Sequence, residues 1–401
     1  MWIERDISQK INGLIQSFPA VVVTGARQTG KTSLLRRLFA DYTYVSLDIP
    51  STAEMASRNP KEFFDHYGPP VLVDEVQYAP ELFRHVKVVI DQHRHTMGQF
   101  ILTGSQKFPL MQSVADSLAG RCAIVELETL SAGELAAAGM VLDTYHQHVH
   151  GLTRGLFPEL WRDPTIPSDA FYQAYLATYI ERDVRQLLNV GSLRDFERFL
   201  RACAVRTGQL LNKSDISRDV GVSQPTISEW LSVLQASNQV ALLEPFFANV
   251  GKRLVKSPKL YFLEPGLLCF MLGVGPDNFT SSPFAGAIWE SFVFAELRKY
   301  QQLYQPRASV FFYRDQQNRE VDFVWSRAGH IVLMEARWAE HVRRPDASVM
   351  ETVASVFNAS TAHAYQIKEA LLICRTPDHF ALTETLRAVN GFRLRNVVAQ
   401  L

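Results

Sequence analysis

The sequence predicts an α/β protein that begins with a parallel β-sheet, continues through helices, and ends in a second α/β domain. Over about the first 125 residues, short apolar runs alternate with helical stretches, which is typical of βαβ units. These runs are Val21–Thr24, Tyr44–Leu47, Val71–Val73 and Phe100–Thr103. Residues 136–190 have a mostly helical pattern. Beyond Ala287 a helical stretch precedes three alternating segments that predict strands; they are Val310–Tyr313, Glu320–Trp325 and His330–Glu335.

The composition fits a chain of two or three globular domains. The 401 residues are 47% hydrophobic and 20% charged, so each domain can bury a core. A formal net charge of zero excludes a global field that would draw the chain to DNA or membranes. The four cysteines form no CxxC pair, which argues against a zinc ribbon or a disulfide framework. No apolar run approaches roughly 20 residues and no signal-peptide pattern opens the chain, so we expect a cytoplasmic protein without membrane contact.

The stretch after the first apolar run matches the phosphate-loop pattern, GxxxxGK followed by Ser or Thr. It reads Gly25-Ala26-Arg27-Gln28-Thr29-Gly30-Lys31-Thr32, followed by Ser33. The glycines let successive N–H groups point at phosphate oxygens, and the next helix directs its positive N-terminal end there. Lys31 is expected to reach the β- and γ-phosphates and Thr32 to ligate Mg²⁺. We therefore expect residues 25–33 to bind ATP, or a close purine triphosphate, with Mg²⁺.

Two acids, Asp74 and Glu75, follow the apolar run Val71–Val73. At the carboxyl end of a parallel strand they would lie beside the phosphate loop. We expect Asp74 to hold Mg²⁺, through water, and Glu75 to act as the general base that polarises the attacking water. The alternative is a solvated strand end. A position about 40 residues after the phosphate loop, at the end of an apolar strand, favours the catalytic interpretation.

Two further polar positions are candidates for contact with the γ-phosphate. The run that ends at Thr103 can lie between the strand before the phosphate loop and the strand before Asp74, where Thr103 or Ser105 would face the phosphate. An ordinary strand followed by a glycine turn is an equal alternative. Arg121 can supply positive charge to the γ-phosphate as an arginine finger, and a solvated arginine is the alternative. The expected catalytic residues are therefore Glu75, Lys31 and Arg121.

These motifs together resemble a prokaryotic group of AAA-like, STAND-related P-loop ATPases with a C-terminal domain of unknown function. The resemblance is carried by Gly25–Thr32, by Val73-Asp74-Glu75-Val76-Gln77, by Leu102-Thr103-Gly104-Ser105-Gln106 and by Leu118-Ala119-Gly120-Arg121. Later stretches, Tyr179–Val184, Arg206–Asn212 and Lys256–Phe262, also resemble this group. The resemblance covers nearly the whole chain, and it implies an ATPase core, a winged helix and a C-terminal domain similar to nucleases.

Residues 213–246 have the pattern of a helix-turn-helix with a strand after it. Ser214 can cap a short helix through Val220, a tight turn follows at Gly221-Val222-Ser223, and Gln224–Ala236 forms the second helix, with Ile227, Leu231 and Leu234 inward. Val240–Leu243 would be a wing strand. The second helix could enter a DNA groove through Gln224, Thr226 and Ser228, aided by Lys213 and Arg218. Residues 191–260 hold ten Lys or Arg against six Asp or Glu, a weak footprint, so a protein contact is an equal alternative.

Three acids in the last part of the chain match the layout of PD-(D/E)xK nucleases. Glu290 lies on a helix, Asp322 on a hairpin strand, and Glu335 ends the next strand. In such nucleases the carboxylates hold Mg²⁺, and a lysine two residues after the second strand acid orients the attacking water. Here Arg337 stands in that position, and arginine cannot exchange a proton. The alternatives are an active Mg²⁺ nuclease and a degenerate nuclease-like domain with a residual second metal site.

The expected domains are an AAA-like P-loop ATPase at 1–135, a helical connector at 136–190, a winged helix at 191–260 and a nuclease-like domain at 261–401. The expected function is Mg²⁺-dependent ATP hydrolysis coupled to the C-terminal half. Two alternatives stay open: an ATP-gated DNA nuclease, and a nucleotide-switched regulator with little turnover. The partners that the sequence allows are ATP, DNA, another protein and a second copy of the chain in a homo-oligomer.

Overall fold

The computed structural model describes residues 1–105, 117–179, 193–246, 257–359 and 365–401. The chain divides into two compact units. The first comprises Met1–Leu130, Phe157–Arg162 and Ala236–Asn238, and the second comprises Ser131–Leu156, Asp163–Gln235 and Gln239–Leu401. Parts of the stretches that carry the family resemblance lie outside the described residues, namely Gln106, residues 180–184 and Lys256. Across the described residues, no helix is both long and apolar enough to cross a membrane.

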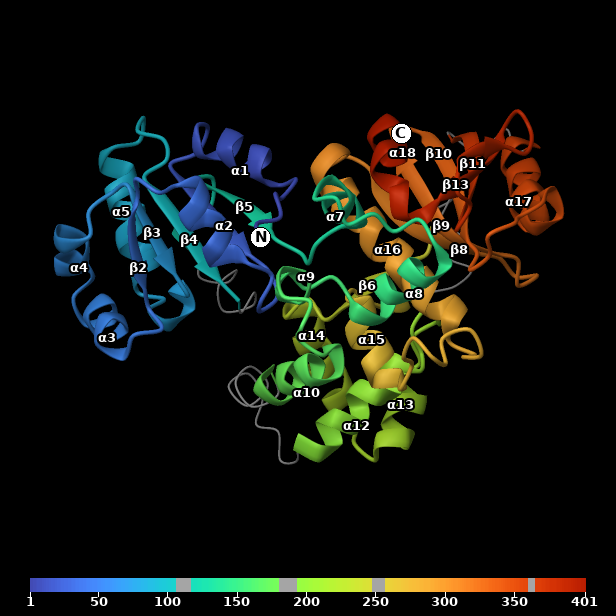
Figure 1. Cartoon of the computed structure of the whole chain (residues 1–401). Coiled ribbons are helices and arrows are strands. Elements are labelled where there is room, and N and C mark those ends of the chain that lie inside the picture. The colour runs from blue at the N-terminus through green and yellow to red at the C-terminus, as the bar shows by residue number, and fades with distance from the viewer. Residues whose placement is uncertain (106–116, 180–192, 247–256, 360–364) are drawn as a thin grey trace. The chain divides into compact units, whose positions relative to one another are not determined.

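The first unit is built on a five-stranded parallel sheet with the strand order β2-β3-β4-β1-β5 (Figure 1). Its strands are β1 (Ala20–Thr24), β2 (Thr43–Ser46), β3 (Val71–Asp74), β4 (Phe100–Gly104) and β5 (Cys122–Glu126). The parallel sheet confirms the fold class that the alternating apolar runs predicted, and β4 lies between β3 and β1 as expected. The sequence analysis did not single out β5, an edge strand whose Ile124 is 45% exposed, although Cys122–Val125 is a short apolar run.

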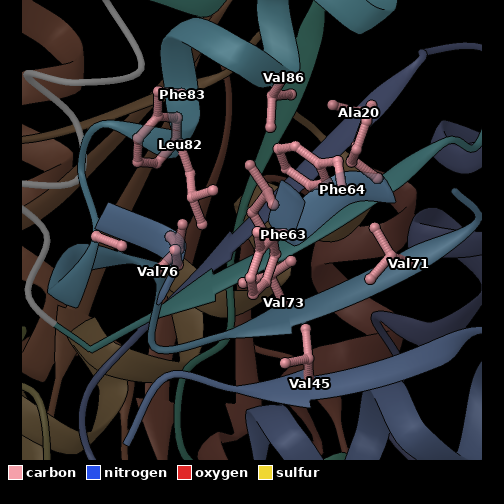
Figure 2. Packing of buried hydrophobic residues seen from close by; sticks show 14 of the residues in the cluster. Ala20, Val45, Phe63, Phe64, Val71, Val73, Val76, Leu82, Phe83 and Val86 are labelled. Carbon is pink, nitrogen blue, oxygen red and sulfur yellow. The ribbon is translucent and has the colours of Figure 1, made fainter. Parts of the chain in front are cut away.

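The helices of the first unit pack around this sheet. They are α1 (Ser8–Ile15), α2 (Lys31–Leu38), α3 (Pro50–Arg58), α4 (Pro60–His66), α5 (Leu82–Gln92) and α9 (Pro158–Arg162), with a 3₁₀ turn at Val76–Tyr78. Residues Leu82, Phe83, Val86 and Ile90 of α5 recur every three or four positions and are buried, which gives the helix one apolar face. Figure 2 shows side chains of α4 and α5 gathered with those of β3 in one core. This core fixes the sheet whose carboxyl edge carries the phosphate loop.

The second unit contains most of the remaining helices. They are α7 (Ala132–Ala137), α8 (Tyr145–Arg154), α10 (Ser168–Tyr179), α12 (Leu193–Ala204), α13 (Lys213–Val220), α14 (Gln224–Ala236), α15 (Pro265–Leu272), α16 (Ala285–Tyr304), α17 (Ser348–Ala359) and α18 (Leu394–Gln400). Short 3₁₀ turns lie at Arg344–Ala347 and Gly391–Arg393. The helices α8, α9 and α10 agree with the helical pattern expected between residues 136 and 190. The domain boundaries at 135, 190 and 260 stay predictions.

The helix pair α13 and α14 forms where the sequence predicted it. Helix α14 has the expected bounds, and Ile227, Leu231 and Leu234 are buried. The cap of α13 corrects one expectation: the Asn212 side chain, not Ser214, accepts hydrogen bonds from the backbone N–H groups of Ser214 and Asp215. Asparagine one residue before the helix reaches those N–H groups directly. The strand β6 (Val240–Leu243) follows α14 and pairs antiparallel with β7 (Lys259–Phe262).

A six-stranded mixed sheet holds the C-terminal part of the second unit, in the order β12-β13-β11-β10-β9-β8. Its strands are β8 (Ser309–Arg314), β9 (Glu320–Arg327), β10 (His330–Ala336), β11 (Gln366–Cys374), β12 (Phe380–Ala381) and β13 (Leu386–Asn390). The first three strands are those that alternation predicted, and they pair antiparallel. Strands β10, β11 and β13 run parallel. The sheet therefore brings β9 and β10, which carry Asp322 and Glu335, side by side.

Candidate nucleotide-binding site and acidic cluster

The loop between β1 and α2 has the backbone that a phosphate loop requires. Gly25 has φ +147°, and a Cβ there would lie 2.1 Å from the carbonyl oxygen of Leu127, so only glycine fits. Gly30 has φ +89° and stands immediately before α2. Glycine adopts such positive φ values without steric cost, which lets the chain turn from the strand into the helix. Helix α2 thus begins at Lys31, with its N-terminus at the loop.

Lys31 is buried against the loop that it follows. Its Nζ donates hydrogen bonds to the carbonyl oxygens of Gly25, at 3.0 Å, and Ala26, at 2.9 Å. The residue is only 6% exposed. The ammonium group is therefore held within the curl of the loop, where it can attract phosphate oxygens.

Three hydroxyl groups surround the carboxylate of Asp74 at the end of β3. Thr32 donates to its Oδ2 at 2.8 Å, Tyr44 donates to the same oxygen at 3.1 Å, and Thr103 donates to its Oδ1. Burial and the negative charge of Asp74 both raise the pKa of Tyr44, so its phenol keeps its proton. The structure thus brings Thr32, Asp74 and Thr103 together, as their motif positions predicted. It adds Tyr44 of β2, which no motif indicated.

Glu75 is held by two neighbouring side chains. Ser105 donates to its Oε2 at 3.2 Å, and the Gln77 amide donates to the same oxygen. Glu75 itself has φ +56°, a conformation that non-glycine residues seldom adopt and that often marks a functional position. Ser105, which the sequence offered as a contact for phosphate, instead contacts the carboxylate beside it.

Arg5 hydrogen-bonds the phosphate loop, a role that no sequence motif predicted. Its guanidinium donates to the carbonyl oxygens of Thr29 at 2.9 Å, Glu128 at 2.7 Å and Thr129 at 3.2 Å. The residue is 8% exposed. A buried guanidinium that bonds both the loop and the segment after β5 fixes their separation. Its partners lie 24 to 124 residues away, so no short motif could have indicated it.

Arg121 lies at the amino ends of the strands, whereas the phosphate loop lies at their carboxyl ends. Contrary to the expectation from the sequence, it therefore does not reach the γ-phosphate of its own chain. Ala20 of β1 is level with Cys122 of β5, and the two strands run parallel. Arg121 therefore precedes the start of β5, whereas the phosphate loop follows the end of β1, about 13 Å further along at ~3.3 Å per residue. Its guanidinium bonds both carboxylate oxygens of Asp91, at 2.7 and 3.1 Å. Arg121 therefore lies far from the phosphate loop, although its motif follows the ATPase motifs in the sequence.

Asp322 and Glu335 lie on neighbouring strands of the second unit. Asp322 Oδ2 accepts a hydrogen bond of 2.9 Å from the Ala336 N–H, and Glu335 Oε1 lies 2.7 Å from Nη2 of Arg337. Burial, with the neighbouring charges of Glu290 and Glu335, raises the pKa of Asp322 well above its usual range. Burial also raises the pKa of Glu335 to about 7, although Arg337 opposes this. These shifts indicate that the three predicted acids act on one another.

A buried lysine, Lys259 of β7, reaches this cluster although the sequence assigned it no role. Its Nζ lies 3.0 Å from Glu290, 2.6 Å from Glu320 and 3.8 Å from Asp322. Burial alone would lower the pKa of Lys259, but the surrounding carboxylates outweigh it and raise that pKa. Within the described residues, no group of three or more His, Cys, Asp or Glu side chains could hold one metal ion. The expected three-carboxylate metal site at Glu290, Asp322 and Glu335 is therefore not formed in this arrangement.

Three family profiles match successive parts of the chain. An AAA domain matches residues 17–136, and two domains of unknown function, DUF8612 and DUF4143, match residues 144–278 and 285–390. Two similar proteins are "Uncharacterized protein Rv2008c" of Mycobacterium tuberculosis and "Uncharacterized protein Mb2031c" of Mycobacterium bovis. Each is 30% identical over 334 residues, which is 82% of this chain and 73% of the relative.

Among solved structures, the Walker-type ATPase PABY2304 of Pyrococcus abyssi is similar with a TM-score of 0.43 and 15% identity. The match covers 68% of this chain and 96% of that one. The AAA match spans the phosphate loop and the parallel sheet described above. The chain therefore belongs to the family of Rv2008c and Mb2031c, and its N-terminal part is an AAA-type P-loop ATPase domain.

Proposed function

We propose that this protein binds ATP with Mg²⁺ at residues 25–33, hydrolyses it slowly, and couples the nucleotide state to its C-terminal half. One observation carries the proposal: Thr32, at the start of α2, donates a hydrogen bond of 2.8 Å to Asp74, at the end of β3. This contact joins the two motifs that a Mg²⁺-dependent ATPase needs at one edge of the sheet.

The residues present fit both ATP and Mg²⁺. Gly25 has no side chain, and a Cβ there would collide with the Leu127 carbonyl. The glycine lets the backbone curl so that its N–H groups can point at phosphate oxygens. The Thr32 hydroxyl and the Asp74 carboxylate are oxygen donors, the class that Mg²⁺ prefers. Bound there, Mg²⁺ would supply positive charge at the phosphates. Lys31 would move its hydrogen bonds from the loop carbonyls to phosphate oxygens.

The proton of the attacking water would pass to Glu75. Gln77 and Ser105 both donate to Oε2 of Glu75, which leaves Oε1 as the acceptor for a water. Thr103 and Tyr44 hold the orientation of Asp74 through its two oxygens. In this scheme each side chain binds, orients or accepts a proton, and none forms a covalent bond with the substrate.

Binding of MgATP to Lys31→Ala tests the proposal. The substitution removes a cation that donates to the carbonyl oxygens of Gly25 and Ala26, so we expect the fold to survive while affinity and turnover fall. Arg37→Ala is the matched control, because Arg37 lies in the last turn of α2 and makes an exposed ion pair with Glu4. Unchanged affinity and turnover in folded Lys31→Ala would contradict the proposal.

The C-terminal half supports a second candidate function, a nucleotide-switched regulator. Helices α13 and α14 followed by β6 and β7 are consistent with a winged helix. Side chains offered as DNA contacts are hydrogen-bonded within the helix pair: Lys213 donates to Ser228, and Gln224 donates to Ser214. Nearby arginines are paired with acids, such as Arg206 with Asp219. This charge pattern favours weak DNA binding or contact with another protein.

The last domain is consistent with a degenerate nuclease-like fold. Glu290 on α16, Asp322 on β9 and Glu335 on β10 occupy the elements that the layout requires. Arg337, which stands where such nucleases have the lysine that prepares a water, forms an ion pair with Glu335. We therefore place ATP-gated DNA cleavage behind ATP hydrolysis and regulation.

A further inference from the structure

The short stretch after β5, residues 127–129, packs directly on the phosphate loop. The carbonyl oxygen of Leu127 lies so close to Gly25 that a Cβ there would be 2.1 Å from it. Arg5 donates to the carbonyl oxygen of Thr29 in the loop and to two carbonyl oxygens of residues 127–129. A shift of the loop must therefore move these residues or break their contacts, because closely packed groups transmit displacement.

The same stretch of chain enters the second unit at Ser131 and is anchored there on α16. The Ala132 N–H, at the start of α7, donates to Oε2 of Glu296 at 3.0 Å (Figure 1). The next N–H, that of Gly133, donates to the hydroxyl of Tyr300 at 3.1 Å. The Tyr300 hydroxyl in turn donates to Oε2 of Glu296 at 2.8 Å. The first turn of α7 is thus held by two side chains one turn apart on α16.

The anchor on α16 is buried and charged. Glu296 and Tyr300 have no exposed surface, and Oε1 of Glu296 accepts a hydrogen bond of 3.0 Å from Nζ of Lys299. Burial and the charge of Glu296 raise the pKa of Tyr300, so the phenol keeps the proton that it donates. Hydrogen bonds to an ionised carboxylate are stronger than those between neutral groups, and breaking them would leave a buried charge with fewer partners. The contact is therefore suited to carry a displacement rather than to yield to one.

Little chain separates the two anchored ends. Only Leu130 and Ser131 lie between the Thr129 carbonyl, which Arg5 holds, and the Ala132 N–H, which Glu296 holds. Both intervening residues are buried, and two residues reach at most about 7 Å. Ser131 is itself fixed, since it forms a capping box with Glu134. A movement of residues 127–129 therefore has no loose loop in which to be absorbed.

We propose that residues 127–133 form a strut that transmits the nucleotide state of the phosphate loop to α16, with Glu296 and Tyr300 as its anchor. The inference rests on the nucleotide site proposed above. Without nucleotide, the Lys31 ammonium bonds loop carbonyls, and phosphate oxygens would draw it away and let the loop rearrange around them. Residues 127–129 follow the loop, and the first turn of α7 displaces α16. That helix also carries Glu290, so the acidic cluster of the second unit receives the signal.

Hydrogen exchange of the full-length chain, followed by mass spectrometry with and without a non-hydrolysable ATP analogue and Mg²⁺, tests the strut. In the wild type we expect slower exchange at residues 25–33 and a changed rate in α7 and α16. Tyr300→Phe removes only the hydroxyl, so the response of residues 25–33 should remain while that of α16 is lost. Tyr304→Phe is the matched control, because it removes a hydroxyl one turn further along α16 that accepts from Arg395, and it should keep both responses.

A second variant breaks the same contact from the other side. A Cβ at Gly133 would lie 2.9 Å from the Tyr300 hydroxyl, so Gly133→Ala should part the two groups and abolish the α16 response as well. Alanine suits a helix, so α7 should still form. Gly286→Ala, on α16 with open space around the added Cβ, is its control and should respond as the wild type does. This pair decides the question if Tyr300→Phe does not fold.

The exchange pattern separates the failure of the strut from the failure of the nucleotide site. An α16 response that persists in folded Tyr300→Phe or Gly133→Ala would overturn the strut. A wild type in which residues 25–33 respond and α16 does not would overturn it too, and would make the contacts a static scaffold. No response at residues 25–33 would instead overturn the nucleotide site, and the strut would fall with its input.

Discussion

The Thr32 hydroxyl lies 2.8 Å from a carboxylate oxygen of Asp74, although 42 residues separate them in the chain. Asp74 ends β3 and Thr32 lies in the first turn of α2. A short strand–loop–helix motif and a distant acidic strand end thus meet at one point. Because the sheet is parallel, the carboxyl ends of β1 and β3 lie at the same edge, and this brings Thr32 and Asp74 close together. The first predictions follow from this contact.

Asp74→Asn is expected to weaken Mg²⁺-dependent ATP binding by about 10- to 100-fold, the usual effect of altering a residue that supports a metal. The amide keeps the shape, its oxygen can accept from one of the two threonine hydroxyls and its NH₂ can donate to the other, so the fold should remain. Affinity for ATP in excess chelator should change little. Isothermal titration with and without Mg²⁺ measures both. Equal losses under the two conditions would mean that Asp74 does not act through the metal.

Glu75→Gln is expected to keep ATP bound while lowering kcat roughly 100-fold or more, because the amide cannot take a proton from water. Steady-state phosphate release and equilibrium ATP binding separate the two effects. Glu81→Gln, an exposed acid six positions later, is the control and should hydrolyse ATP normally. Wild-type turnover in Glu75→Gln would remove the general-base assignment.

Arg5→Ala is expected to weaken ATP binding and to lower the free energy of unfolding by about 2 kcal/mol, since hydrogen bonds from charged groups contribute roughly 1.5–3 kcal/mol. Three buried or partly buried carbonyl groups would lose a donor, among them that of Thr29 in the loop. Urea denaturation and ATP titration check the two effects. Arg37→Ala, from an exposed ion pair, should change neither by much. A loop that binds ATP normally in Arg5→Ala would assign Arg5 a role in stability alone.

If the winged helix binds DNA, the affinity should be low and its salt dependence shallow, with a slope of about four or less. The limit comes from the excess of ten Lys or Arg over six Asp or Glu in residues 191–260. Lys213→Glu with Arg218→Glu should weaken binding on any duplex. Arg58→Glu, on an exposed helix of the other unit, is the control. Fluorescence anisotropy at several salt concentrations decides, and no binding even at low salt would favour a protein partner.

The C-terminal domain of the wild type is expected to cut DNA poorly or not at all. Arg337 pairs with Glu335 and cannot exchange a proton, so it does not replace the lysine that prepares a water in such nucleases. Plasmid nicking with Mg²⁺ measures the activity. Arg337→Lys should raise any residual nicking, and Asp322→Ala should remove it. Efficient cleavage by the wild type that is lost in Asp322→Ala would favour the ATP-gated nuclease.

The local pattern of the sequence was enough for much of the fold. The phosphate loop, the presence of a helix directly after it, and the bounds of α14 follow from residues that are neighbours in the chain. Strand β5 was missed although Cys122–Val125 is apolar, because so short a run with no motif at its end does not distinguish an edge strand from other apolar segments. Strands β11 and β13 of the second sheet were missed as well.

What the sequence determined by itself is local: the glycine-rich loop between β1 and α2, and the acids Asp74 and Glu75 where β3 ends. Only the tertiary structure decided that Arg121 lies at the far edge of its sheet, that Arg5 and Tyr44 support the nucleotide site, and that Lys259 enters the acidic cluster. The physical reason is range. Turn and helix signals depend on residues a few positions apart, whereas a buried charge is placed by packing between segments distant in the chain.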